Sequence, residues 1–154
     1  MNLQMTRMTS LESWRTPYDE DTDGFNPRWW LAGSFSDDSD DWWSFNNNGI
    51  EVARVLVSDG TIKDAYENIV PPARIKDITF FEVRTQYRRN GIGRESVQML
   101  VDHYKGKVLT AFSAGADTFW NRIGFMLCPR KDGEDKDGCV PRRYDPLFVH
   151  DDRL

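Results

Sequence analysis

The sequence has few residues of the kinds that build metal centres or disulfide frameworks, and it has no long hydrophobic run. Only two cysteines (Cys128, Cys139) and two histidines (His103, His150) occur among 154 residues, at spacings that match no metal site. We therefore expect no metal, and cysteines that are reduced rather than paired. No segment approaches the length of a membrane span, and residues 1–10 lack the apolar core of a signal peptide. These absences favour a cytoplasmic protein.

Basic residues are also fewer than acidic ones. Twenty basic residues stand against 25 acidic ones, which gives a net charge of −5. This balance argues against nonspecific binding to nucleic acid and is compatible with a cationic small substrate. A hydrophobic content of 39% is typical of a globular protein, and the length fits one domain.

The chain divides by composition into a polar start and an aromatic-rich remainder. Residues 1–28 are polar, acidic and contain proline, so we expect a loosely structured N-terminal extension with a short helix at Leu11–Arg15. Residues 29–154 are expected to form the domain. It opens with two candidate strands around an acidic turn, namely Trp29-Trp30-Leu31 with Phe35, and Trp42-Trp43 with Phe45.

The rest of the sequence alternates between strand-like and helix-like segments. Asn46–Gly49 is a turn signal, and five strands are expected at residues 50–57 (closed by a turn at 58–60), 78–83, 108–112, 125–128 and 146–150. Amphipathic helical stripes are carried by Val97, Leu100, Val101 and Tyr104, and by Ala116, Phe119, Trp120 and Ile123. The order predicts an α/β domain in which strands 78–83 and 108–112 are parallel neighbours.

A turn rich in glycine and arginine, Arg88-Arg89-Asn90-Gly91-Ile92-Gly93-Arg94, joins strand 78–83 to the helix that follows. At such a turn, consecutive backbone N–H groups and the positive end of the helix favour an anion. Gly91 and Gly93 carry no Cβ, so a phosphate can approach the backbone closely. The arginines add positive charge. The turn therefore predicts phosphate binding.

Three classes of phosphate site compete for this signature. A Walker A loop requires Gly-Lys-Ser/Thr, which is absent. A dinucleotide fingerprint would require a glycine at position 96, where Ser96 stands. The remaining class is binding of an acyl-coenzyme A (acyl-CoA).

Over residues 78–128 the chain resembles the GNAT superfamily of acyl-CoA-dependent N-acyltransferases. The superfamily's turn, R/Q-x-x-G-x-G/A, is matched by Arg88, Gly91 and Gly93, and its later aromatic pair with Gly-Phe is matched by Phe119-Trp120-Asn121-Arg122-Ile123-Gly124-Phe125. The resemblance implies a single domain of the α/β class (an α+β mixed sheet), with a splayed mixed β-sheet flanked by helices, and acetyl-CoA as co-substrate. It implies, in addition, that strands 78–83 and 108–112 diverge toward their C-terminal ends.

The same resemblance implies roles for individual residues. The backbone of Phe81 and Val83 would pair with the pantetheine arm, and the backbone from Arg89 through Asn90, Gly91, Ile92 and Gly93 to Arg94 would hold the pyrophosphate. Trp120 stands where the superfamily often has a tyrosine, and an indole cannot serve as a proton source. It is either a contact of the acyl or pantetheine arm or a core residue, which leaves Tyr87 and Tyr104 as other proton donors.

Glu82 is the one acid within the predicted strand 78–83. Its carboxylate could accept the proton of an attacking amine, directly or through water. The alternative is a strand position that faces solvent or an arginine.

These inferences favour an N-acetyltransferase that moves the acetyl group of acetyl-CoA to a primary amine by direct attack. A non-catalytic acyl-CoA-binding sensor or interaction module is the alternative, and an adaptor with an exposed Trp-rich face is a remoter one. The sequence does not choose among a small amine, a peptide N-terminus, a lysine and an aminoacyl group as acceptor. A homodimer is left open, and neither nucleic acid nor a membrane is expected as a partner.

Overall fold

The structure is a computed structural model that describes residues 1–9, 16–30, 40–135 and 144–153. The chain forms two compact units, the first from residues 1–58 and 79–102 and the second from residues 59–78 and 103–154. Strand β4 (Ile75–Val83) contributes residues to both units. It begins three residues before the predicted strand.

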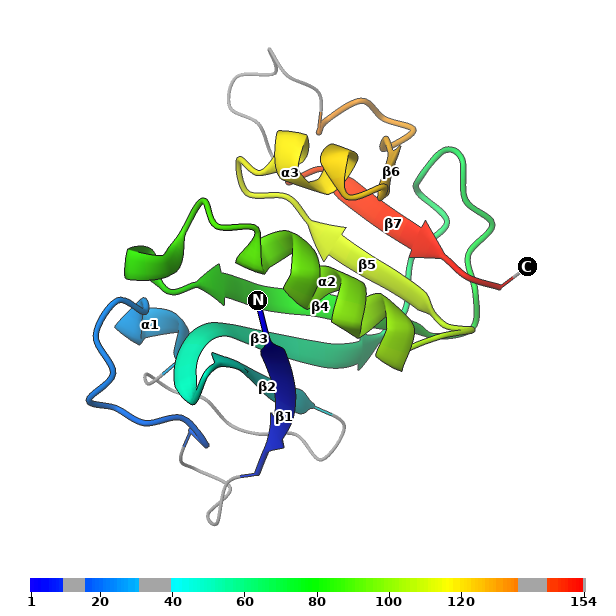
Figure 1. Ribbon diagram of the computed structural model, residues 1–154. Helices are drawn as coiled ribbons and strands as arrows, with labels where there is room; N and C mark the ends of the chain where they lie inside the picture. The colour runs from blue at the N-terminus through cyan, green and yellow to red at the C-terminus, as the bar shows by residue number, and fades with distance from the viewer. Residues whose placement is uncertain (10–15, 31–39, 136–143, 154) are drawn as a thin grey trace. The chain divides into compact units, whose positions relative to one another are not determined.

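The strand order of the first unit is β1-β2-β3-β4 (Figure 1). β1 (Leu3–Met8) pairs antiparallel with β2 (Asp41–Asn47), and β2 pairs antiparallel with β3 (Ile50–Gly60). Asn48 and Gly49 connect β2 to β3 with φ angles of 52° and 81°. Positive φ at both positions matches the right-handed twist of a hairpin, which confirms the predicted turn. The turn predicted at residues 58–60 is wrong, because β3 continues through Gly60.

The start of the chain is more ordered than its composition predicts. β1 forms a six-residue ladder with β2, from Leu3 opposite Asn47 to Met8 opposite Trp42. Further along, Tyr18 and Phe25 are buried in the core of the unit. The expectation of a loosely structured start is therefore wrong for these residues, because their partners are distant strands that local composition does not reveal. The predicted helix at Leu11–Arg15 lies outside the described residues.

The first aromatic cluster is helical, so the strand predicted at Trp29-Trp30-Leu31 is wrong where the structure describes it. Pro27–Trp30 form the short helix α1. Asn26 precedes it, and its Oδ1 accepts a hydrogen bond from the backbone nitrogen of Arg28 at 2.9 Å. An asparagine cap followed by proline at the first helical position is a strong helix start. This local signal outweighs the strand preference of the two tryptophans.

Three tryptophans described in the first unit lie in its core. Trp30 is fully buried, and Trp42 and Trp43 on β2 are each 5% exposed. Of the tryptophans that the structure describes in this unit, only Trp29, at 38%, shows a substantial part of its ring, and that ring stacks on Phe80 of β4 with centroids 5.4 Å apart. The described tryptophans of this unit therefore do not form the exposed Trp-rich face that the adaptor hypothesis requires.

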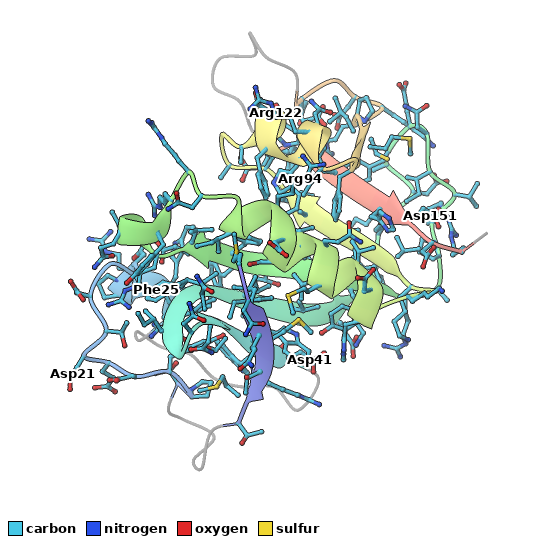
Figure 2. All side chains as sticks on the ribbon, viewed as in Figure 1. Asp21, Phe25, Asp41, Arg94, Arg122 and Asp151 are labelled. Atoms are coloured by element: carbon cyan, nitrogen blue, oxygen red, sulfur yellow. The ribbon has the colours of Figure 1, made fainter. Side chains whose placement is uncertain are left out.

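A buried arginine holds the N-terminal segment to β3. Arg54 is 1% exposed, and its guanidinium donates from Nε (2.9 Å) and Nη2 (2.7 Å) to Oε1 of Glu51. It lies 4.6 Å from the ring centroid of Tyr18 and 4.1 Å from that of Phe25. Figure 2 labels Phe25 on the N-terminal loop beside the β3 ribbon. The ion pair and the rings compensate for the guanidinium's lost hydration.

The second unit contains a mixed sheet in the order β4-β5-β7-β6. β4 is parallel to β5 (Val108–Phe112), with Lys76 opposite Leu109 and Asp77 opposite Thr110. β7 (Leu147–Asp151) is antiparallel to both β5 and the edge strand β6 (Met126–Cys128). The parallel pair and the mixed sheet with helices confirm the predicted fold class. The divergence of β4 and β5 stays a prediction.

Two helices follow the amphipathic stripes predicted from the sequence. α2 (Ile92–His103) buries Ile92, Ser96, Val97 and Leu100, and α3 (Asp117–Arg122) buries Trp120. Gly106 and Gly124, beyond the two helix ends, have φ angles of 83° and 90°, which suit glycine. None of the described helices combines the length and the apolar character that crossing a membrane requires.

Candidate functional site

The predicted phosphate turn lies between β4 and α2, within the first unit. A single 3₁₀ turn, η1 (Thr85–Tyr87), follows the strand, and Arg88 returns to extended backbone with ψ 156°. Arg89 has a φ of 66° and Gly91 a φ of 77°. α2 then begins at Ile92.

The first turn of α2 presents backbone N–H groups that have no acceptor among the described residues. The helix's first hydrogen bond runs from the nitrogen of Glu95 to the carbonyl of Gly91, 3.1 Å apart. Gly91 occupies the capping position, and it has no side chain to accept from Ile92, Gly93 or Arg94. A Cβ built on Gly91 would meet nothing within 4 Å. These donors, the helix dipole and the open space suit an anion.

Cationic side chains surround this turn. Arg88, Arg89 and Arg94 are all exposed, and Figure 2 labels Arg94 on α2. Asn90 is exposed as well, and its Nδ2 donates to the carbonyl of Tyr87 at 3.4 Å. The turn therefore combines fixed backbone donors with mobile positive charge.

Hydrogen bonds join residues 23–26 of the N-terminal loop to residues 82–86, the segment that leads into this turn. We call this set of hydrogen bonds the clasp. Asp23 accepts from Arg84 through its carbonyl (2.7 Å) and its carboxylate (2.9 Å). Its other carboxylate oxygen accepts from Gln86 at 3.1 Å. The carbonyl of Gly24 accepts from the nitrogen and the hydroxyl of Thr85. The clasp therefore fixes η1 immediately before the turn.

Glu82 is tied into the same clasp. Its Oε1 accepts from the backbone nitrogen of Asn26 at 2.7 Å and from Nε1 of Trp30 at 2.9 Å. Among the described residues, its Oε2 accepts one longer contact, from Nη2 of Arg88 at 3.4 Å. Two neutral donors thus hold one oxygen of the carboxylate, whereas the other oxygen accepts a single long hydrogen bond from a described residue. It also faces an arginine, as one of the two sequence-based interpretations of Glu82 predicted.

Arg88 folds back along β4. Its Nε donates to the carbonyl of Val83 at 3.0 Å, in addition to the contact with Glu82, and its side chain remains 53% exposed. Phe81 and Val83 are half-buried on the strand. Because side chains alternate along a strand, they face the side opposite to Glu82.

Trp120 is a core residue of the second unit. It is 5% exposed, and its ring lies 5.0 Å from the ring centroids of both Phe119 and Phe125. Cys128 is fully buried and unpaired, and burial raises the pKa of its thiol to about 11. This fits the expectation of an inert thiol. Cys139 lies outside the described residues, and within them no cluster of His, Cys, Asp or Glu could hold a metal.

The sequence predicts the turn but gives no indication of the residues that support it. Asp23, Gly24, Asn26 and Trp30 lie more than fifty positions before their partners, so no local pattern joins them to Glu82 or η1. Two local signals were nevertheless present, the Asn26-Pro27 helix start and the glycine at position 24.

Comparison with known proteins relates the chain to acetyltransferases through its fold. No protein-family model and no curated protein matches the sequence. Among solved structures, the putative N-acetyltransferase YhhK from E. coli bound to coenzyme A aligns with a TM-score of 0.57 and 14% identity, over 97% of this chain and 100% of that one. The KacTA–DNA complex aligns with a TM-score of 0.63 and 11% identity, over 99% and 94% of the two chains.

A third structure is the Bacillus subtilis N-acetyltransferase YlbP in complex with coenzyme A. It aligns with a TM-score of 0.51 and 16% identity over 71% of this chain, and the match spans 66% of YlbP, just under two thirds of its length. These likenesses show that the chain has the fold of the GNAT acetyltransferases.

Proposed function

We propose that this protein is an N-acetyltransferase that binds acetyl-CoA at the turn Arg88–Arg94 and transfers its acetyl group to a primary amine. The observation that carries the proposal is the first turn of α2, where the N–H groups of Ile92, Gly93 and Arg94 have no acceptor among the described residues. The chain shares its fold with N-acetyltransferases whose structures contain coenzyme A.

The residues of the turn fit the pyrophosphate of coenzyme A. The backbone donors lie together in the first turn of α2, a Cβ on Gly91 would meet nothing within 4 Å, and Arg89 and Arg94 can pair with phosphate oxygens. When bound, acetyl-CoA would supply a thioester with a good leaving group. The protein's contribution is to hold the two reactants together.

Glu82 is the proposed acceptor of the amine's proton. Asn26 and Trp30 fix the carboxylate through Oε1, so Oε2 keeps lone pairs for a proton that arrives directly or through water. The amine's nitrogen would form the amide bond as the thioester bond breaks, and the released proton would pass to Oε2.

A non-catalytic acyl-CoA-binding module is the second candidate, and one observation favours it. The carboxylate of Glu82 already accepts three hydrogen bonds that join α1, the clasp and the turn. A purely structural role could account for all three. The turn would then bind the coenzyme without turnover.

Two measurements on the intact protein separate these candidates. Calorimetry with coenzyme A tests binding, and thiol release from acetyl-CoA with a panel of small amines, peptides and aminoacyl compounds tests transfer. Binding with amine-dependent thiol release supports the transferase. Binding without release for any amine supports the module, and the absence of binding would refute both.

A further inference from the structure

We infer that Arg88 is a positioning residue that exchanges between Glu82 and the bound pyrophosphate, so that filling the turn releases the proton-accepting oxygen of Glu82. The inference rests on the proposed function. It concerns a contact that the motif alone does not contain, namely the return of the Arg88 side chain to β4.

The contacts that hold Arg88 are weak enough to exchange. Its Nη2 lies 3.4 Å from Oε2 of Glu82, and the arginine side chain is 53% exposed. The Glu82 side chain is only 11% exposed, but the length of the contact and the exposed guanidinium keep this ion pair weak. A pyrophosphate offers the same guanidinium two adjacent anionic groups, which arginine binds in a bidentate manner. An anion at the start of α2 therefore competes well for Arg88.

The carboxylate of Glu82 can lose its hydrogen bond from Arg88 and still keep its position. The donors from the loop and from α1, Asn26 N–H and Trp30 Nε1–H, are neutral, and both bind Oε1. Arg88 is the one cation that contacts the carboxylate among the described residues, and it binds Oε2. Its departure would leave Oε1 anchored and Oε2 open. Proton acceptance would then be available only when the turn is filled.

The substitution Glu82→Gln tests the exchange through the direction in which it changes the affinity for coenzyme A. The amide oxygen can keep the bonds from Asn26 and Trp30, while the amide NH2 faces Arg88 donor to donor. Arg88 is then free before the ligand arrives. We expect the variant to bind coenzyme A about two- to five-fold more tightly, the equivalent of an exposed ion pair. Equal or weaker binding would overturn the inference, and the double-mutant cycle below separates the release of Arg88 from the loss of a negative charge near the anion.

A double-mutant cycle supplies the matched control. In an Arg88→Gln background, Glu82→Gln should change the affinity for coenzyme A far less, because no contact remains to release and only the loss of the carboxylate charge acts. In an Arg89→Gln background it should still tighten binding, since Arg89 belongs to the same turn and, in the part of the chain that the structure describes, makes no contact with Glu82. The same tightening in both backgrounds would contradict the role of Arg88.

The resonance of the Arg88 Nε–H group gives a readout that is independent of activity. A ¹⁵N NMR titration of the wild-type protein with coenzyme A should move this signal, because its acceptor changes from the Val83 carbonyl to phosphate. Binding that leaves the signal in place would refute the exchange while leaving the proposed function standing. Failure of coenzyme A to bind at all would instead refute the proposed function.

Discussion

The carbonyl oxygen of Gly24 accepts hydrogen bonds from both the backbone nitrogen and the side-chain hydroxyl of Thr85, each at 3.0 Å. The approach is close enough that a Cβ on Gly24 would lie 2.0 Å from Oε1 of Gln86. Gly24 also has a φ of 91°, a backbone angle that residues with a side chain rarely adopt. The clasp beside the candidate site thus depends on a residue without a side chain.

Replacing this glycine should loosen the clasp. Gly24→Ala combines the strain of its positive φ with displacement of the Gln86 side chain, so we expect a loss of about 1–3 kcal/mol in the free energy of unfolding, measured with urea. Gly49→Ala is the control, because its φ is 81° and nothing lies within 4 Å of the added Cβ. Equal losses for the two variants would mean that the close approach to Gln86 has no energetic weight.

The phosphate turn should be sensitive to a side chain that the folded protein itself tolerates. Gly91→Glu places a carboxylate where the backbone donors meet an anion, and we expect calorimetry to show at least about a tenfold loss of affinity for coenzyme A. Gly106→Glu has a similar φ, 83°, and equally open space, but lies after the other end of α2. It should bind coenzyme A normally. Unchanged binding by Gly91→Glu would remove the turn from the site.

Arg54 should contribute far more to stability than an exposed arginine does. Arg54→Met leaves Glu51 without its buried cation, so we expect a loss of about 3–5 kcal/mol in the free energy of unfolding. The control is Arg7→Met, because Arg7 pairs with Asp41 at 2.8 Å while 55% exposed, and it should lose at most about 1 kcal/mol. Similar losses for the two would contradict the importance of the buried network.

Cys128 should make stability depend on alkaline pH. Burial, aided by the charge of Asp151, raises the pKa of its thiol from 9.0 to about 11, so the folded state favours the neutral form. Its stabilising contribution is complete below pH 9 and is lost as the pH rises toward 11. In a Cys139→Ser background, urea unfolding should show the protein losing stability relative to its Cys128→Ala variant over this interval. A constant difference would contradict the buried neutral thiol.

The sequence predicted best those features whose signals are local. The Asn48-Gly49 turn, the stripe of α2 and the glycines of the phosphate turn each depend on neighbouring residues. The structure bears out the first two and gives Gly91 the positive φ that only glycine adopts freely. The boundaries of β3 and β4 shifted because pairing with other strands, rather than composition, decides where a strand ends.

The supporting half of the site could not be predicted in the same way. The sequence places Glu82 as an acid in a predicted strand. Its partners Asn26 and Trp30 belong to segments that the sequence predicts to be loosely structured and extended, respectively. Nothing in the sequence around residue 82 indicates that a distant asparagine cap will orient its carboxylate. Such pairings depend on the completed fold.

The separation between the two halves of the clasp also sets an order of events during folding. Arg84 and Thr85 meet Asp23 and Gly24 across 61 positions, whereas β2 and β3 meet across a two-residue turn. Closing a long loop costs more chain entropy than closing a hairpin, so the β2–β3 hairpin should form early and the clasp late. The last contacts to form would then be those that fix the lead-in to the phosphate turn, and a newly made chain would become competent for its ligand only at the end of folding.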